Sequence, residues 1–440
     1  MRRCWIVFTL VAPGWLLSAY ASEPIPVSRF TLPNGLEVWH VFRAESQSVG
    51  LSLCVRAGSR HEPASQQGIS HVLEHLCFEG TERFSQGESE MLDVITSRGG
   101  VWNATTQEER TIYWAVLPAS QFNIAAEWIA QLVFHPLLPE NKLETVRSVV
   151  FAEKGGKWDW FDRHGFGMDL DAEVRRALFP DSTLAARTIG QDKTIEALSH
   201  ADVMAYYTKH YMPNNAVLIV VGNITRDQLS QACESHFAHL EPGTLPDPPG
   251  ETRLPESPPE RSVVRGMTAG RHGSVMIGVR TFGGSSPGRA AFEVLAELLN
   301  QRLLKELHFQ RGIAYQMGAA NEWFSDTGYF AVFAQGKRNK LRQIEAVIQG
   351  EIDRVRQGDV KADEFEAAKT ALAGKYALSL EGNFGWMRRL ESLTFLYAMN
   401  EPLPSIAADI ESVTPEDLAQ IVDTYFTPVR QCVAVHKPLF

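Results

Sequence analysis

The sequence predicts an α+β fold made of two similar halves, and three observations lead to this prediction. The chain has 440 residues, too many for one ordinary domain. Segments with strand and helix periodicity are mixed along its first half. A stretch rich in Pro, Gly and Glu at 239–262 then separates two parts whose sequences resemble each other. Hydrophobic residues make up 44% of the chain, enough for sizeable cores.

The first residues are typical of an export signal. Two arginines precede an apolar run at 4–17, and residues 19–21 read Ala-Tyr-Ala, an A-x-A cleavage site. We therefore expect a signal peptide at 1–21 and a periplasmic protein of a Gram-negative bacterium, with no stable membrane span after cleavage. An uncleaved anchor is the alternative, although the run is marginal in length and contains a Pro-Gly pair. A mitochondrial presequence fits less well, because the segment is apolar rather than Arg-rich.

The expected domain organisation follows from the position of the linker. We expect an N-terminal domain at 22–238, a linker at 239–262 and a C-terminal repeat domain at 263–440. The segment 198–222 aligns with 413–437 at a constant offset, and each copy predicts a capped helix, a proline stop and a β-branched strand. The matched pairs are Ser199 with Thr414, Asp202 with Asp417, Tyr211 with Phe426, and Pro213 with Pro428.

The elements of the first half can be placed in order along the chain. Alternation at 49–60 predicts a strand that ends at a Gly-Ser turn. The next segment predicts a helix that Ser70, or a residue just before it, can cap and Gly80 can end. Further patterns predict a strand at 111–118 and helices at 125–136 and 140–156. We expect the helices to pack on one face of the sheet.

The helix after the first strand carries the sequence His71-x-x-Glu74-His75. On a helix, His71 and His75 lie one turn apart on one face and can bind one Zn²⁺ at about 2.0–2.1 Å. Glu74 reaches the same side, where it can take a proton from a zinc-bound water. This is the inverzincin motif. A core helix with satisfied histidines is the alternative, but three such polar groups in an apolar helix are costly without partners.

A catalytic zinc needs a third protein ligand, and three downstream glutamates are candidates. They are Glu140, Glu144 and Glu153. The four cysteines that follow the predicted signal peptide do not predict a disulfide framework in a chain of this size. Cys54, Cys77, Cys233 and Cys432 include no C-x-x-C pair, and buried hydrophobic roles are expected for them. The net charge of −10 and the absence of a basic run give no footprint for nucleic-acid binding.

With a glutamate about eighty residues after its H-x-x-E-H motif, the sequence resembles the pitrilysin or insulinase-like metallopeptidases, which include mitochondrial processing peptidase. Four further segments carry the resemblance over nearly the whole mature chain. They are GSRHEPASQQGISHVLEHLCFEGT, GGVWNATTQEERTIYW at 99–114, YMPNNAVLIVVGNI, and QRGIAY at 310–315.

The resemblance implies halves built of two related α+β units, each with a sheet covered by helices. It implies one zinc per chain, bound by His71, His75 and Glu153, with Glu74 as general base. It also implies that an extended peptide substrate pairs with a sheet edge near Val101 to Ala104, where Asn103 and Ala104 would contact it. Main-chain pairing would hold peptides of varied sequence. A plain edge or turn role for Asn103 remains open.

The second half lacks this chemistry, since no H-x-x-E-H follows residue 240 and the corresponding helix, within 289–307, contains no histidine. The resemblance implies that this half closes a substrate chamber and supplies an arginine and a tyrosine. Tyr315 matches the tyrosine, whereas His308 occupies the arginine position. Active relatives often carry a second glutamate where this chain has Val146.

Two functions are therefore expected. The first is a zinc endopeptidase acting on peptides or unfolded segments, and the alternative is a weakly active or non-catalytic peptide-binding partner subunit. The intact ligand set favours the first, and His308 and Val146 favour the second. The resemblance also implies association into a homodimer, or into a heterodimer with a related chain that supplies the missing arginine.

Overall fold

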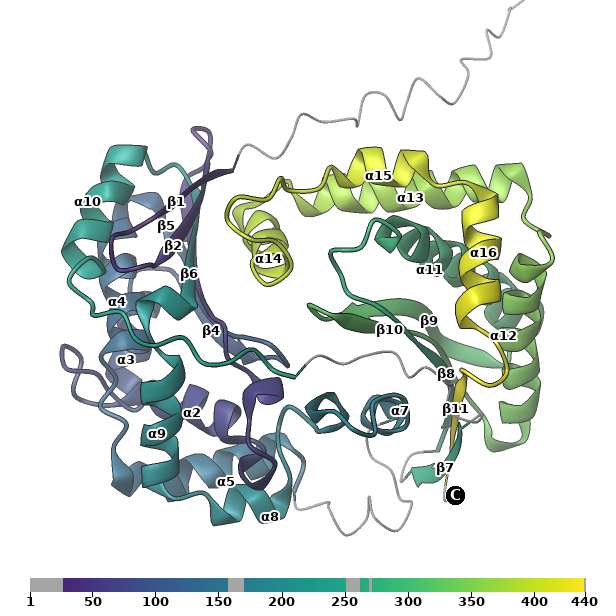
Figure 1. The fold of residues 1–440 in the computed structure, drawn as a ribbon, viewed down its shortest axis with the longest axis horizontal. Helices are drawn as coiled ribbons and strands as arrows, with labels where there is room; N and C mark the ends of the chain where they lie inside the picture. The colour runs from purple at the N-terminus through teal and green to yellow at the C-terminus, as the bar shows by residue number, and fades with distance from the viewer. Residues whose placement is uncertain (1–26, 157–169, 251–261, 269–270, 439–440) are drawn as a thin grey trace, which may run out of the picture.

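The computed structural model describes residues 27–156, 170–250, 262–268 and 271–438. Within these residues the chain forms two helix-covered sheets that face each other across the molecule (Figure 1). The N-terminal half, purple to teal, lies on the left of Figure 1, and the C-terminal half, green to yellow, lies on the right. The chain is therefore α+β with two halves, as predicted. The predicted signal peptide at 1–21 lies outside the described residues.

The N-terminal sheet has six strands. Their order across the sheet is β1 (Ser28–Thr31), β2 (Glu37–Phe42), β6 (Ala216–Gly222), β3 (Ser48–Val55), β5 (Thr111–Pro118) and β4 (Val101–Thr106). Only the pair β2–β6 is parallel. The predicted strands at 49–60 and 111–118 correspond to β3 and β5, and the segment expected to hold substrate is the edge strand β4.

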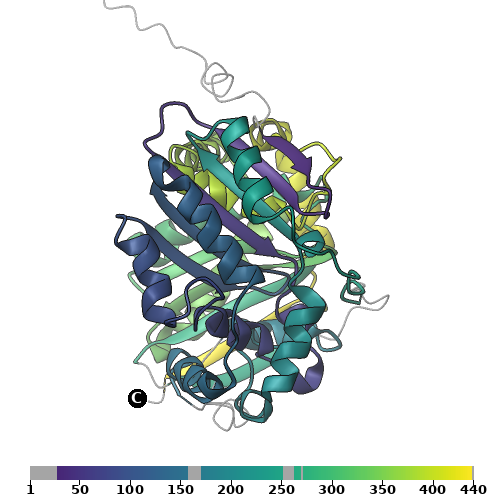
Figure 2. The ribbon, with the colours of Figure 1, turned by 90° about the vertical axis from the view of Figure 1, so that its left-hand side faces the viewer.

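The helices of the N-terminal half cover one face of this sheet. In Figure 2 they lie in front of the strands in blue and teal. They are α2 (Ile69–Cys77), α3 (Glu88–Thr96), α4 (Phe122–Phe134), α5 (Leu143–Glu153), α8 (Asp192–Ala197), α9 (His200–His210) and α10 (Arg226–His236). Their apolar residues form one continuous core with the sheet, and this core includes the buried Trp128 of α4.

The C-terminal sheet has five strands. Their order is β7 (Ser262–Thr268), β11 (Cys432–Pro438), β8 (Gly273–Phe282), β10 (Thr327–Gly336) and β9 (Ala314–Trp323), with only β7–β11 parallel. The helical elements of this half are α11 (Arg289–Leu303), a π-helix (Leu304–Gln310), α12 (Leu341–Arg356), α13 (Ala362–Ser379), α14 (Asn383–Leu393), α15 (Ile406–Ser412) and α16 (Pro415–Tyr425).

The two segments predicted to be copies of each other have the same local structure. Ser199 caps α9 and Thr414 caps α16, each by accepting a hydrogen bond from the backbone N–H three residues on. The aspartates Asp202 and Asp417 complete a capping box in both helices. A buried strand follows each helix, β6 in one half and β11 in the other.

The two halves exchange one helix each, which differs from the expectation that helices cover one face only. Helix α14 packs on the inner face of the N-terminal sheet, where Met387 and Leu390 meet Trp39 and Ile219. Helix α7 (Leu170–Leu178) packs on the C-terminal sheet. At its contact, Gly278 of β8 leaves room that a Cβ atom would fill, since that atom would lie 2.6 Å from a methyl group of α7.

Buried polar contacts join the halves beside these helices. The Arg60 guanidinium bonds Glu109 at 2.6 Å and Asp326 of the other half at 2.7 Å. The Ser52 hydroxyl donates to Glu391 at 2.6 Å. Because a buried charge is costly without its partner, these contacts fix how the two sheets face each other.

The predicted linker is described in part. Residues 241–250 form no helix or strand, residues 251–261 lie outside the described residues, and β7 begins at Ser262. The domain boundaries 22–238 and 263–440 therefore stay predictions. In the described part of the chain, every helix is too short or too polar to cross a bilayer.

Candidate metal centre

Helix α2 places the two histidines of the motif side by side. Val72, Leu73 and Leu76 are fully buried in the core and fix the rotation of the helix. His71 and His75 consequently lie on its other side, one turn apart, with their Nε2 atoms 3.3 Å from each other.

A carboxylate from a preceding loop holds the start of α2. Glu62 accepts hydrogen bonds from the backbone N–H groups of Gly68 at 2.8 Å and Ser70 at 2.9 Å. The helix is capped at Gly68, whose φ of 98° suits glycine, and no side chain of the capping residue takes part. Of the two predicted alternatives, Ser70 or a residue just before it, the cap is the second, since the Ser70 hydroxyl bonds Tyr206.

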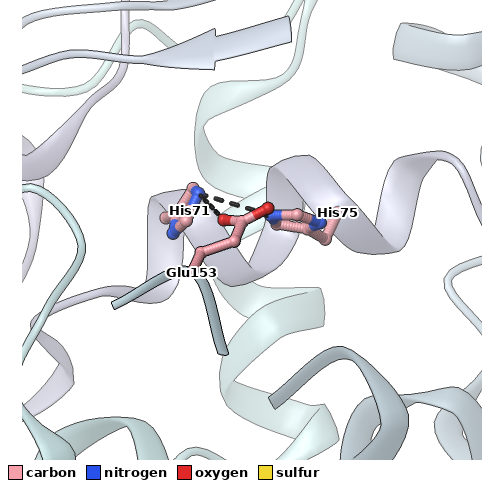
Figure 3. Close-up of side chains that lie close together, drawn as sticks. All are labelled: His71, His75 and Glu153. Atoms are coloured by element: carbon pink, nitrogen blue, oxygen red, sulfur yellow. Dashed lines mark hydrogen bonds and ion pairs between the residues drawn. The ribbon is translucent and has the colours of Figure 1, made fainter. Parts of the chain in front are cut away.

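Glu153, the last residue of α5, completes the group (Figure 3). Its Oε2 atom lies 3.3 Å from Nε2 of both His71 and His75. The other candidates point elsewhere, since Glu140 is exposed and Glu144, also exposed, pairs with Arg147. Within the described residues, these three side chains are the one group of His, Cys, Asp or Glu with metal-binding geometry.

The geometry and the donor types fit zinc. Three ligand atoms lie 3.3 Å apart in pairs. Tetrahedral ligands about 2.0–2.1 Å from Zn²⁺ are separated by about 3.3 Å, the same spacing. Two imidazoles and one carboxylate are also the ligand set of one known class of catalytic zinc site. Burial, together with the neighbouring His75, lowers the pKa of His71 to about 4. The ring is therefore neutral, as metal binding requires.

Glu74 lies beside this group and is buried. Its carboxylate accepts a hydrogen bond from the Thr106 hydroxyl at 2.5 Å. Burial raises its pKa to about 7 against the opposing hydrogen bond from Thr106, and the charge of Glu153 adds to the rise. Sequence reasoning missed Thr106 as a partner, although it is the final threonine of the quoted GGVWNATT segment.

One pocket contains the three ligands, Glu74 and the edge strand. Besides the ligands and Glu74, it is lined by Phe78, Trp102, Asn103, Ala104, Thr105, Thr106, Val146, Val149, Thr188 and Ile189, with Glu79 and Glu88. Asn103 is exposed and its side-chain oxygen accepts from the backbone N–H of Ala104 at 2.8 Å. Val146 is buried, so this wall of the pocket is apolar where a carboxylate was considered.

His308 and Tyr315, the residues of the C-terminal half that the resemblance assigns to the site, do not line this pocket. His308 lies in the π-helix and Tyr315 on β9, with their rings 5.8 Å apart. His308 Nδ1 lies 3.3 Å from the carbonyl oxygen of Ala314. Tyr315 is 68% exposed. The structure therefore brings these two residues together but does not bring them to the metal ligands.

Two family models match the sequence. The model described as insulinase (peptidase family M16) matches residues 41–158, and the model described as peptidase M16 inactive domain matches residues 197–372. Together they cover more than half of the chain.

Proteins of known sequence and structure resemble the chain along its length. An uncharacterized zinc protease of Mycobacterium leprae is 29% identical, covering 90% of this chain and 89% of that protein. An uncharacterized zinc protease of Bacillus subtilis is 26% identical, covering 91% and 96%. A solved protease from Helicobacter pylori has a TM-score of 0.86 at 22% identity, covering 94% and 100%. A solved peptidase M16 inactive domain from Pseudomonas fluorescens has a TM-score of 0.83 at 17% identity, and the match covers 94% of this chain and 99% of that chain. These two structures show the same fold.

Proposed function

Because the chain belongs to the insulinase-like peptidase family M16, we propose that it is a zinc-dependent endopeptidase that hydrolyses peptides or unfolded segments. The observation that carries this proposal is the triangle of His71, His75 and Glu153 with Glu74 in the same pocket. The relatives of the chain that are named zinc proteases support the same chemistry.

Each residue of the group has a separate task in this proposal. His71 and His75 would hold zinc through Nε2, and Glu153 through a carboxylate oxygen. The bound ion would supply Lewis acidity and an acidic water ligand. Glu74 would accept a proton from the water that attacks the peptide carbonyl and would pass it to the nitrogen of the departing amine. Thr106 keeps the carboxylate of Glu74 turned toward the pocket.

The substrate would bind along β4 as an added strand. This strand is at the edge of its sheet, pairs on one side with β5, and lines the pocket through Asn103 and Ala104. Main-chain hydrogen bonds along such an edge hold an extended peptide whatever its side chains are. Phe78 and Trp102 would form an apolar wall for one substrate side chain.

A second candidate function is a weakly active or non-catalytic partner subunit. Two observations favour it: His308 and Tyr315 lie outside the metal pocket, and Val146 leaves an apolar wall there. Either function is compatible with the proposals that the chain is exported to a periplasm and that it associates with a second copy or a related chain. In that assembly, the other chain would present its arginine and tyrosine to this zinc.

Metal content and peptide turnover of the purified mature chain test the proposal. We expect about one zinc per chain. We also expect cleavage of an unstructured peptide that stops on chelation and returns with added zinc. His71→Ala should lose both zinc and turnover. Stoichiometric zinc in His71→Ala would refute the ligand assignment, and zinc without turnover in the wild type, alone or mixed with a related chain, would favour the non-catalytic subunit.

A further inference from the structure

A pocket in the C-terminal half collects positive charge from segments far apart in the sequence. The sheet brings together the start of β8 and the ends of β10 and β11, since Gly273 pairs with Gly336 and Ser274 with His436. Helix α12 begins a few residues after β10. Five cationic side chains from these segments line one pocket, namely Arg271, Lys337, Arg338, Arg342 and Lys437. In Figure 1, β11 and α12 lie on the right, across the molecule from α2 and α5.

These five cations outnumber the carboxylates that line the same pocket by five to one. All five are exposed, and none forms an ion pair with a described carboxylate. One carboxylate, Glu345, also lines the pocket. Many other cations of the protein are paired, such as Arg302 and Arg354 with Glu351. This gathering of positive charge occurs in a chain whose net charge is −10, so the overall composition does not account for it.

The start of α12 makes this arrangement electrostatically unfavourable unless an anion is present. A helix N-terminus carries partial positive charge and favours acidic side chains. Helices α9 and α16 follow this rule with a capping aspartate. Helix α12 has no acidic residue in its first turn and no side-chain cap, and its second residue is Arg342. Repulsion among the cations and with the helix end would be relieved by a bound anion.

We propose that this pocket binds phosphate groups, carried by a soluble phosphate or by the headgroup of an anionic lipid. Arg271, Arg338 and Arg342 offer planar guanidinium groups that pair with phosphate oxygens through two hydrogen bonds. Lys337 and Lys437 add point charges around them. A dianionic inorganic phosphate gains more from such a cluster than a single carboxylate does, and a membrane of anionic lipid presents several singly charged phosphodiesters to it. No residue of the metal pocket takes part, so this site does not depend on the proposed peptidase activity.

Binding to the full mature chain can be measured with two probes. Inorganic phosphate is titrated by calorimetry at low ionic strength, and sedimentation compares vesicles of phosphatidylglycerol with vesicles of phosphatidylcholine. We expect binding to phosphate, to phosphatidylglycerol vesicles, or to both, weakening as salt rises. Binding to the vesicles alone identifies a lipid headgroup as the source, and binding to phosphate alone identifies a soluble ligand. Polyglutamate serves as a carboxylate competitor.

The double variant Arg338→Glu/Arg342→Glu should weaken binding at least tenfold. It should also fold, because an acidic residue in the first turn of α12 is favourable. Lys437→Ala, which leaves the helix untouched, should weaken binding by a smaller factor. Arg83→Ala/Arg98→Ala removes two exposed cations from the N-terminal half and should bind as the wild type does. Unchanged binding in the double variant, absence of binding to both probes, or binding of polyglutamate alone would overturn the proposal.

Discussion

The hydroxyl of Thr106 donates a hydrogen bond to Oε2 of Glu74 over 2.5 Å. Thr106 is the last residue of the edge strand β4, and Glu74 lies on α2 between the two histidines. The strand that we propose to hold the peptide therefore also orients the proposed base. This contact couples the position of the substrate backbone to the position of the carboxylate.

Thr106→Val should lower kcat about tenfold to a hundredfold, because it deletes a hydrogen bond to a charged group while keeping the shape of the side chain. KM and zinc content should change little. Thr106→Ser keeps the hydroxyl and should recover most of the rate. Steady-state kinetics with zinc analysis measure this. If Ser and Val variants are equally impaired, the hydroxyl does not position Glu74.

Glu74→Gln should retain zinc and lose peptide hydrolysis by roughly a hundredfold or more, because an amide cannot accept the proton from water. The change preserves size and the acceptor for Thr106. The measurement is zinc content together with initial rates on one peptide. Glu88→Gln, a change at an exposed carboxylate that lines the same pocket, is the matched control and should retain most activity. Near-normal turnover in Glu74→Gln would show that this residue is only structural.

Glu62 makes a prediction about stability and pH. Burial raises its pKa from 4.5 to about 7, against the hydrogen bonds from Gly68 and Ser70 that lower it. The pKa is 4.5 in the unfolded state and about 7 in the native state. Between pH 4.5 and pH 7 the native state therefore binds more protons, and the free energy of unfolding falls as pH rises. The loss contributed by this group is about 3 kcal/mol, complete above pH 7.

Glu62→Gln should remove that part of the pH dependence, because glutamine does not ionise. Urea unfolding of wild type and variant at pH 5, 6, 7 and 8 measures it. As pH rises from 5 to 8, the free energy of unfolding of the wild type should fall relative to that of the variant. Parallel curves would contradict the prediction and indicate that Glu62 is already ionised in the native state at pH 5.

The parts of the site that follow helix geometry could be predicted from sequence. The spacing of His71 and His75 fixes them on one helix face, and Ser199 and Thr414 are local caps whose partners lie three residues away. The Thr106 contact could not, because it joins residues 32 positions apart. The Glu62 contacts span only six and eight residues, but they depend on the conformation of the loop before α2, which no periodicity shows. Spacing alone did not decide which of Glu140, Glu144 and Glu153 is the third ligand. The packing of α5 on α2 decides it, because it brings only Glu153 to the two histidines.

The exchange of α7 and α14 was also beyond the sequence pattern. An amphipathic helix shows which face is apolar but not which sheet will receive it. A signal was nevertheless present in β6, whose residues are apolar without alternation, as expected of a strand buried on both faces. The helices of the other half supply the second cover.

Leu390→Ala tests this exchange. The side chain is fully buried between α14 and the N-terminal sheet, so its truncation should cost about 2–5 kcal/mol of stability. Leu378→Ala on α13, where the side chain is 73% exposed, should cost less than about 0.5 kcal/mol. Hydrogen exchange in Leu390→Ala should show lost protection in β3 and β6, although the mutation lies in the C-terminal half. Loss confined to the C-terminal sheet would contradict the prediction.

His308→Arg should raise peptidase activity. His308 stands where the family resemblance implies an arginine, and its ring contacts Tyr315 outside the metal pocket. An imidazole lacks the planar five-donor fork of arginine, so a transition-state contact made by this residue would be weaker. We therefore expect weak turnover from the wild-type chain alone. Turnover should rise with His308→Arg or on addition of a related chain that bears the arginine.

Gln310→Arg adds the same charge two residues away and should have no effect. Rates measured beside sedimentation, which reports the assembly state, check this. Efficient cleavage by a monomeric wild-type chain, with no response to His308→Arg, would contradict it, because the region would then take no part in catalysis.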